Sequence, residues 1–154
     1  MSTTVQVGAL AGADGPCAPG VFRSEPAAAF ARLSRPVRPA ASRSRSALVG
    51  VVPSTKMGEA FPFESARERD AMHLLDALED VAAFRPQALR AAYAHEGRQS
   101  VAFPDLLVLL RTGGVEAWEV KAAAALTPMV RARLRAVADA LARQGIRYRV
   151  RTEA

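Results

Sequence analysis

Residues 103–121 read FPDLLVLLRTGGVEAWEVK, and this stretch decides the fold. The apolar run LLVLL precedes the turn-forming triplet TGG, and the segment VEAWEVKAA follows it. Short strand-like segments on either side of a turn that contains glycine predict a β-hairpin. We therefore expect paired strands over residues 100–110 and 115–123.

The hairpin loop determines which side chains share a face of the sheet, because side chains alternate along a strand. A three-residue loop over residues 112–114 places Asp105 opposite Lys121 and diagonal to Glu119. All three polar side chains then project from one face. A two-residue loop sends Asp105 to the opposite face, unless a bulge near Pro104 restores the parity.

Two carboxylates that converge on one face repel each other unless a cation lies between them. Hard oxygen ligands suit Mg²⁺, with Mn²⁺ as a substitute, and such ions retain waters and bind a substrate phosphate. Lys121 is one of two lysines among 21 basic residues. Its compact amine is suited to orient or help deprotonate a metal-held water. Alternatively, Asp105 starts a strand and Glu119 and Lys121 form an exposed pair worth less than about 1 kcal/mol.

The segment before the hairpin has helical periodicity. Ala71, Leu74, Leu75 and Leu78 fall on one stripe, which predicts a helix over residues 65–80. Its apolar stripe is expected to pack against the sheet.

Glu68 is a candidate third carboxylate, because it lies on the same helical stripe as Ala71 and Leu75. However, Ser65 and Glu68 also form the S-x-x-E pattern of a capping box, in which the glutamate accepts a hydrogen bond at the helix start. From spacing alone, capping is the favoured interpretation.

The remaining elements complete a mixed α/β fold. ALRAAYAH, residues 88–95, predicts a strand before the hairpin. Thr127 and Pro128 suit the start of a second helix that ends at Gly145. Residues 146–151, IRYRVR, predict a final strand. The order of helix, three strands, helix and strand predicts a mixed sheet flanked by helices.

Composition divides the chain into a tail and one folded unit. The chain has 154 residues, a net charge of +6 and one cysteine, Cys17, so no intrachain disulfide is expected. Residues 1–60 are basic and rich in proline, alanine and serine, which predicts a flexible arm, either a solvated tail or a DNA-contacting one. Residues 61–154 are the predicted folded domain. No run is long enough for a membrane span, so we expect a protein of the bacterial cytosol or nucleoid.

Asp105 after Pro104, followed by Glu119, Val120 and Lys121, resembles the motif of the PD-(D/E)XK nuclease superfamily. Residues 53–87, PSTKMGEAFPFESARERDAMHLLDALEDVAAFRPQ, are similar to the N-terminal catalytic domain of TnsA-type transposon endonucleases. The resemblance covers roughly residues 50–125. The matching residues are Glu64, Ser65, Glu68, Arg69, Asp70, Val81, Phe84, Gln87 and Tyr93.

The resemblance implies a restriction-endonuclease-like core that binds magnesium. It assigns Glu68, Asp105 and Glu119 as carboxylates around the ion and Lys121 as the catalytic lysine, so that Glu68 is a ligand and not only a cap. Ala88 departs from the family pattern, which usually has proline there. The winged-helix domain that members commonly append is expected to be lacking.

The function that follows from the resemblance is Mg²⁺-dependent hydrolysis of double-stranded DNA at transposon ends. The expected partners are a DDE-type transposase subunit and an ATPase regulator, with no membrane. A non-catalytic DNA-binding module on the same core and a repair or restriction nuclease remain open as alternatives. Four further residues are predicted to support the site or to contact DNA: Gln87, Lys56, Arg131 and Arg135.

Overall fold

The computed structural model describes Phe30 and residues 50–153. Residues 1–29 and 31–49 lie outside the described residues, and with them Cys17 and most of the predicted arm. The described residues form a four-stranded sheet, two hairpins, two α-helices and a short 3-10 helix, η1 (Ala123–Ala125). Neither these helices nor any other described helix has the length and apolarity needed to cross a bilayer.

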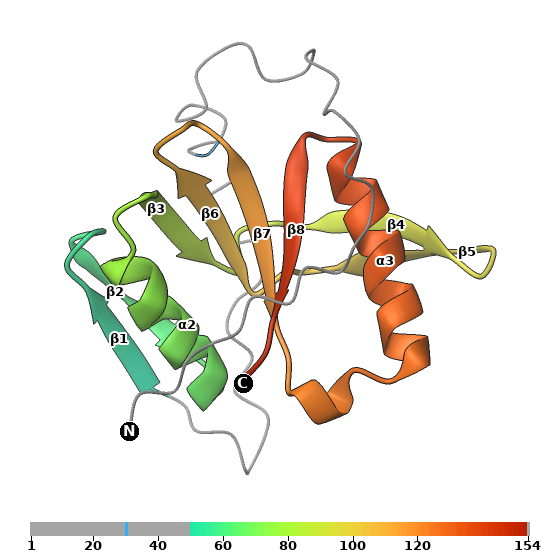
Figure 1. Ribbon diagram of the computed structural model, residues 1–154, viewed down its shortest axis with the longest axis horizontal. Coiled ribbons are helices and arrows are strands. Elements are labelled where there is room, and N and C mark those ends of the chain that lie inside the picture. The colour runs from blue at the N-terminus through green and yellow to red at the C-terminus, as the bar shows by residue number, and fades with distance from the viewer. Residues whose placement is uncertain (1–29, 31–49, 154) are drawn as a thin grey trace.

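A mixed four-stranded sheet forms the centre of the fold, in the order β3-β6-β7-β8 (Figure 1). The strand β6 pairs antiparallel with β3 and β7, whereas β8 runs parallel to β7. A parallel neighbour requires a crossover connection, and the helix α3 between β7 and β8 supplies it. The bounds are β3 Val81–Pro86, β6 Leu106–Leu110, β7 Val115–Val120, β8 Ile146–Arg151 and α3 Pro128–Ala142.

The two faces of the sheet bury separate cores. Alternate residues of β6 and β7 point to opposite sides, so Leu106, Val108 and Trp118 pack beneath α2 (Ala66–Ala77), while Leu107 and Ala117 belong to the core beneath α3. The mixed α/β sheet with a helix over each face confirms the predicted fold class, a restriction-endonuclease-like core.

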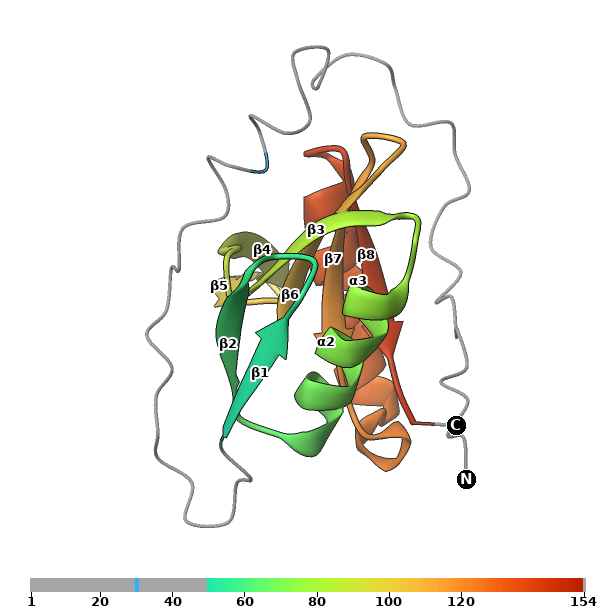
Figure 2. The same cartoon turned by 90° about the vertical axis from the view of Figure 1, so that its left-hand side faces the viewer.

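Two hairpins lie outside the central sheet, and neither was predicted in this form. The hairpin of β1 (Gly50–Ser54) and β2 (Glu59–Phe63) packs along α2 (Figure 2). The predicted boundary at residue 60 therefore falls inside a strand, and the ordered fold begins earlier in the chain. The second hairpin joins β4 (Ala91–His95) to β5 (Arg98–Ala102), beside α3.

Two predicted strands differ in the structure. The strand expected over residues 100–110 is two strands, β5 and β6, because Pro104 lacks the N–H that a continuous ladder needs. The strand β3 was not predicted. Its pairing with β6 shifts between Val81 and Ala83, and this irregularity removes the clean alternation on which sequence prediction depends.

Lys56 connects the first hairpin to the end of α2. Its Nζ donates to the carbonyl oxygens of Leu75, at 2.7 Å, and Leu78, at 2.5 Å. The last carbonyls of a helix have no partner within the helix, and a cation near them is favourable. Lys56, which was predicted to support the site or contact DNA, thus satisfies the C-terminal end of α2.

Asp76 secures the same junction from the helix side. Its carboxylate accepts hydrogen bonds from the Ser54 hydroxyl and from the backbone N–H groups of Thr55 and Lys56. These bonds, of which the one from Ser54 is the strongest influence, hold the pKa of Asp76 below its ordinary value.

Replacing Asp76 with alanine should lower the free energy of unfolding by roughly 1 to 3 kcal/mol, because several donors lose their acceptor. The exposed Asp70 on the same helix pairs, among the described residues, only with neighbouring Arg69, so Asp70→Ala is the matched control. Urea unfolding of both variants measures the difference. Equal stabilities would contradict this role for Asp76.

Candidate active site

The register of the β6–β7 hairpin decides how the predicted site residues meet. Leu106 pairs with Trp118, and the Leu110 N–H donates to the Gly114 carbonyl at 2.8 Å. The loop is therefore residues 111–113, with Gly113 at a φ of 89°, as is common for three-residue hairpin loops. The predicted loop began one residue later.

This one-residue difference in the loop moves the strand pairing by two residues. Continuing the register by one residue beyond the pair of Leu106 and Trp118 brings Asp105 opposite Glu119, and not opposite Lys121 as predicted. Because side chains alternate with a period of two, the shift keeps Asp105 and Glu119 on the same face. Both continue the face of the sheet on which Leu107 and Ala117 pack beneath α3.

Asp105, Glu119 and Lys121 form one compact group. The Lys121 ammonium lies 2.6 Å from the Glu119 carboxylate, whose side chain is only 10% exposed. The Val120 N–H donates to Oδ2 of Asp105 at 2.7 Å. The aspartate is thus attached to the backbone of the strand that carries the other two groups.

The group contains two carboxylates, Asp105 and Glu119, and one amine, Lys121, and this excess of acid shifts the pKa values. Burial, and then the charge of Glu119, raise the pKa of Asp105 to about 7. Burial lowers the pKa of Lys121, but the neighbouring Glu119 carboxylate more than offsets this and raises it above the ordinary value. Lys121 is therefore a stable cation that is suited to orienting an oxygen ligand and not to accepting a proton.

Glu68 lies at the start of α2 and has the hydrogen bonds of a capping residue. Its Oε1 accepts from the Ser65 hydroxyl at 2.9 Å and its Oε2 from the Glu64 N–H at 3.1 Å, while the Glu68 N–H donates to Ser65 Oγ at 3.2 Å. This is the capping that the spacing favoured, with one difference: the Glu68 carboxylate reaches back to the N–H of Glu64 and not to that of the N-cap residue Ser65. The charge of Glu68 also contributes, as the smallest of the named influences, to the raised pKa of Asp105.

The described residues contain no group of three or more His, Cys, Asp or Glu side chains arranged to hold a metal ion. The carboxylates that do come together are those of Asp105 and Glu119, a pair of hard oxygen donors in a buried setting. Such a pair fits Mg²⁺, which is commonly bound by one or two carboxylates together with waters and substrate phosphate.

Gln87 supports the loop that carries Asp105. It follows β3 with a φ of 47°, which is uncommon for a residue other than glycine. Its N–H donates to the Asp105 carbonyl at 2.9 Å, and its Oε1 is buried without a hydrogen-bond partner among the described residues. Gln87 thus contacts the backbone of Asp105, and its role in supporting the site stays a prediction.

The arginines of α3 are placed differently from one another. Arg131 Nε donates to the Leu126 carbonyl at 3.0 Å, next to the helix start, and Arg135 is exposed to solvent. Arg133, which was not predicted, is the one whose charge reaches Lys121 and Tyr148.

Tyr148 was also missed by the sequence analysis. It lies on β8, partly buried, with Glu119 and Asp105 close enough for their charges to act on its hydroxyl. Burial, and then the Glu119 charge, raise the pKa of Tyr148 above its ordinary value. No local pattern indicates this residue, because its neighbours come from the pairing of β8 with β7.

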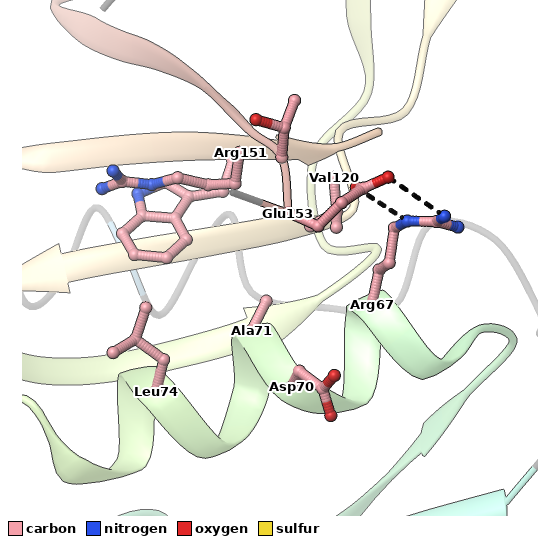
Figure 3. A pocket seen from close by; sticks show the side chains of 9 residues that line it. Arg67, Asp70, Ala71, Leu74, Val120, Arg151 and Glu153 are labelled. Atoms are coloured by element: carbon pink, nitrogen blue, oxygen red, sulfur yellow. Dashed lines mark hydrogen bonds and ion pairs between the residues drawn. The ribbon is translucent and has the colours of Figure 1, made fainter. Parts of the chain in front are cut away.

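A pocket lies on the other face of β7, between α2 and the end of β8 (Figure 3). The Arg151 guanidinium stacks on Trp118 at 3.9 Å from the ring centroid, and Arg67 pairs with Glu153 at 2.9 Å. Trp118 and Val120 line this pocket, whereas Glu119 between them does not. It is therefore separate from the group of Asp105, Glu119 and Lys121.

Replacing Asp105 with asparagine should stabilise the protein above pH 7. The raised pKa means that the folded state binds a proton more tightly than the unfolded chain, so stability falls as pH rises from about 4 to about 7. Asparagine removes the charge and keeps an acceptor for Val120. We expect a gain of about 1 to 4 kcal/mol at pH 8 that vanishes near pH 4.

Thermal melts across this pH range measure the effect, with the exposed Asp139→Asn as the control. If Asp105→Asn and the wild type have the same melting temperature at every pH, the charge of Asp105 does not destabilise the folded protein.

The comparison with protein families identifies this part of the chain. Residues 78–153, about half of the sequence, match the model of the TnsA-like endonuclease N terminal. No curated protein matches the sequence at a significant level. The matched region contains Asp105, Glu119 and Lys121 and begins after Glu68, while the sequence resemblance had been centred further toward the N-terminus. Residues 78–153 belong to the TnsA-like endonuclease N-terminal family.

Proposed function

We propose that this protein is a metal-dependent DNA endonuclease that cuts at transposon ends, as the TnsA-like subunit of a heteromeric transposase. A domain of this family indicates a nuclease function in transposition, with DNA binding and a transposase partner in general. The observation that carries the proposal is the meeting of Asp105, Glu119 and Lys121 on one face of the β6–β7 pair.

In this proposal Asp105 and Glu119 hold a divalent ion, Mg²⁺ or Mn²⁺. When bound, the ion supplies an activated water and stabilises charge on the scissile phosphate. The raised pKa of Asp105 supports the assignment, because a cation relieves the repulsion between the two acids. Glu68 is the proposed third ligand, and joining the ion requires its carboxylate to leave the contacts with Ser65 and Glu64.

The other residues orient these groups and the substrate. Lys121, a cation beside Glu119, positions the attacking oxygen or the phosphate. Gln87 holds the backbone at Asp105. Arg131 and Arg135 on α3 are proposed phosphate contacts, with binding that weakens as salt rises. The proposed partners are double-stranded DNA, a DDE-type transposase subunit and an ATPase regulator.

A second candidate function is a DNA-binding module that performs no chemistry. Two contacts favour it: Lys121 is paired with Glu119 at 2.6 Å, and both oxygens of Glu68 are engaged at the helix start. In that case Glu119 and Lys121 neutralise each other and DNA is bound but not cut. A repair or restriction nuclease on the same core would differ only in its substrate.

Alanine at Glu119 or at Lys121 should reduce Mg²⁺-dependent nicking by at least about 100-fold, the scale expected for loss of a group that stabilises charge in the transition state. DNA affinity should change little. The assay uses plasmid with candidate transposon ends, with and without Mg²⁺ and the partner transposase. The exposed Asp139→Ala is the control, and unchanged nicking in both variants would remove the assignment.

Comparing Glu68→Ala with Ser65→Ala separates a ligand from a cap. Each variant breaks the capping box and should lose about 1 kcal/mol of stability. If Glu68 binds the ion, only Glu68→Ala loses nicking when both are assayed well below their melting temperatures. Equal nicking by the two variants would assign Glu68 to capping alone.

A further inference from the structure

Tyr148 lies beside the acidic pair through the parallel pairing of β7 with β8. Ala117 pairs with Tyr148 and Glu119 pairs with Val150. Because alternate residues of a strand share a face, Tyr148 projects on the same side as Glu119, two positions away in the register. The packing confirms the side: Ile146, two residues before Tyr148, belongs to the core beneath α3, and Tyr148 packs against that core.

The Tyr148 hydroxyl is buried and makes no hydrogen bond of ordinary geometry to the described residues, although Glu119 is close enough to influence it as a hydrogen-bonding group. A buried hydroxyl without a well-formed hydrogen bond is unfavourable, so its position beside the site calls for an explanation. The charges that act on this hydroxyl are those of Glu119, Asp105 and Arg133. A phenol hydroxyl next to carboxylate oxygens is a hydrogen-bond donor to them.

The existing contacts leave one oxygen of each carboxylate as an acceptor, and Glu119 has the stronger influence on Tyr148 of the two acids. Lys121 engages Oε1 of Glu119, and the Val120 N–H engages Oδ2 of Asp105. Oε2 of Glu119 is thus not used by Lys121, and Glu119 lies diagonal to Tyr148 across the strand pair. Lys121 reaches the carboxylate along β7, and Tyr148 approaches it from β8.

We propose that Tyr148 is a positioning residue of the nuclease site, whose hydroxyl donates to Glu119 Oε2 when the site is loaded and fixes the carboxylate toward the cation. This inference rests on the proposed function. Outer partners of metal-binding carboxylates orient them in this way, and their loss costs about 10- to 100-fold in metal affinity or activity.

Tyr148→Phe tests the role, because it removes only the hydroxyl. We expect about 10-fold weaker Mn²⁺ binding by the full chain without DNA, measured by calorimetry. Nicking should show about a 10-fold lower kcat with an unchanged KM for DNA. The melting temperature should be unchanged or higher, because an unpaired buried group has been removed.

Tyr93→Phe is the matched control, since Tyr93 is the other tyrosine of the chain and is buried on β4 in the core beneath α3. It should leave Mn²⁺ affinity and kcat at the wild-type values. Tyr148→Phe with wild-type Mn²⁺ affinity and kcat would overturn the inference, and a lower melting temperature with both unchanged would show a purely structural residue.

The two proposals fail in different ways. Wild-type protein that binds Mn²⁺ but does not nick DNA would refute the nuclease proposal, and the Mn²⁺ affinity of Tyr148→Phe would still decide the role of Tyr148. Wild-type protein that binds no Mn²⁺ would overturn both.

Discussion

The pairing of β6 with β7 is the constraint on which the site depends. It places Asp105 and Glu119 on one face, and the N–H of Val120 attaches the aspartate to its partner strand. The apolar residues of β6 fix this register from both sides, because Leu106 and Val108 fill the core under α2 and Leu107 fills the core under α3. A slip by one residue would exchange the two cores and separate the acids.

The stability that the two cores give the fold offsets the repulsion between the two acids at the end of β6 and β7. Two carboxylates share a buried face with one amine, and the pKa of Asp105 records the strain. Perturbed titration of this kind is typical of functional sites. On the opposite face of β7 the buried acid is Glu116. Its carboxylate pairs with the Arg149 guanidinium at 3.2 Å and accepts a hydrogen bond from the Trp118 indole N–H at 2.9 Å. The charge of Glu116 is therefore already paired, whereas Asp105 and Glu119 form a pair of acids that can bind a cation.

Local periodicity was sufficient to predict α2, α3, β8 and the hairpin, because each has a regular pattern bounded by caps or glycine. It also predicted that Asp105 and Glu119 share a face, because an error of two residues in register leaves each side chain on the same face of the sheet.

Local periodicity was not sufficient to predict β3, because its irregular pairing hides the strand period. It also did not predict the first hairpin, which lies in a region of biased composition. Tyr148 and Arg133 could not be found from sequence, because they reach the site through the β7–β8 pairing and through α3, which are long-range contacts. For Glu68, spacing predicted the capping contacts that are seen, and its role as a ligand stays a prediction.

The attachment of Asp105 to the main chain, and not to a side chain, affects how this protein can vary. Every amino acid except proline offers the same N–H at position 120, so drift at that site leaves the aspartate held in place. Homologous sequences are therefore free to exchange residues there to suit the pocket on the α2 side, while the acid on the other face keeps its orientation. Two surfaces of one strand can in this way evolve independently.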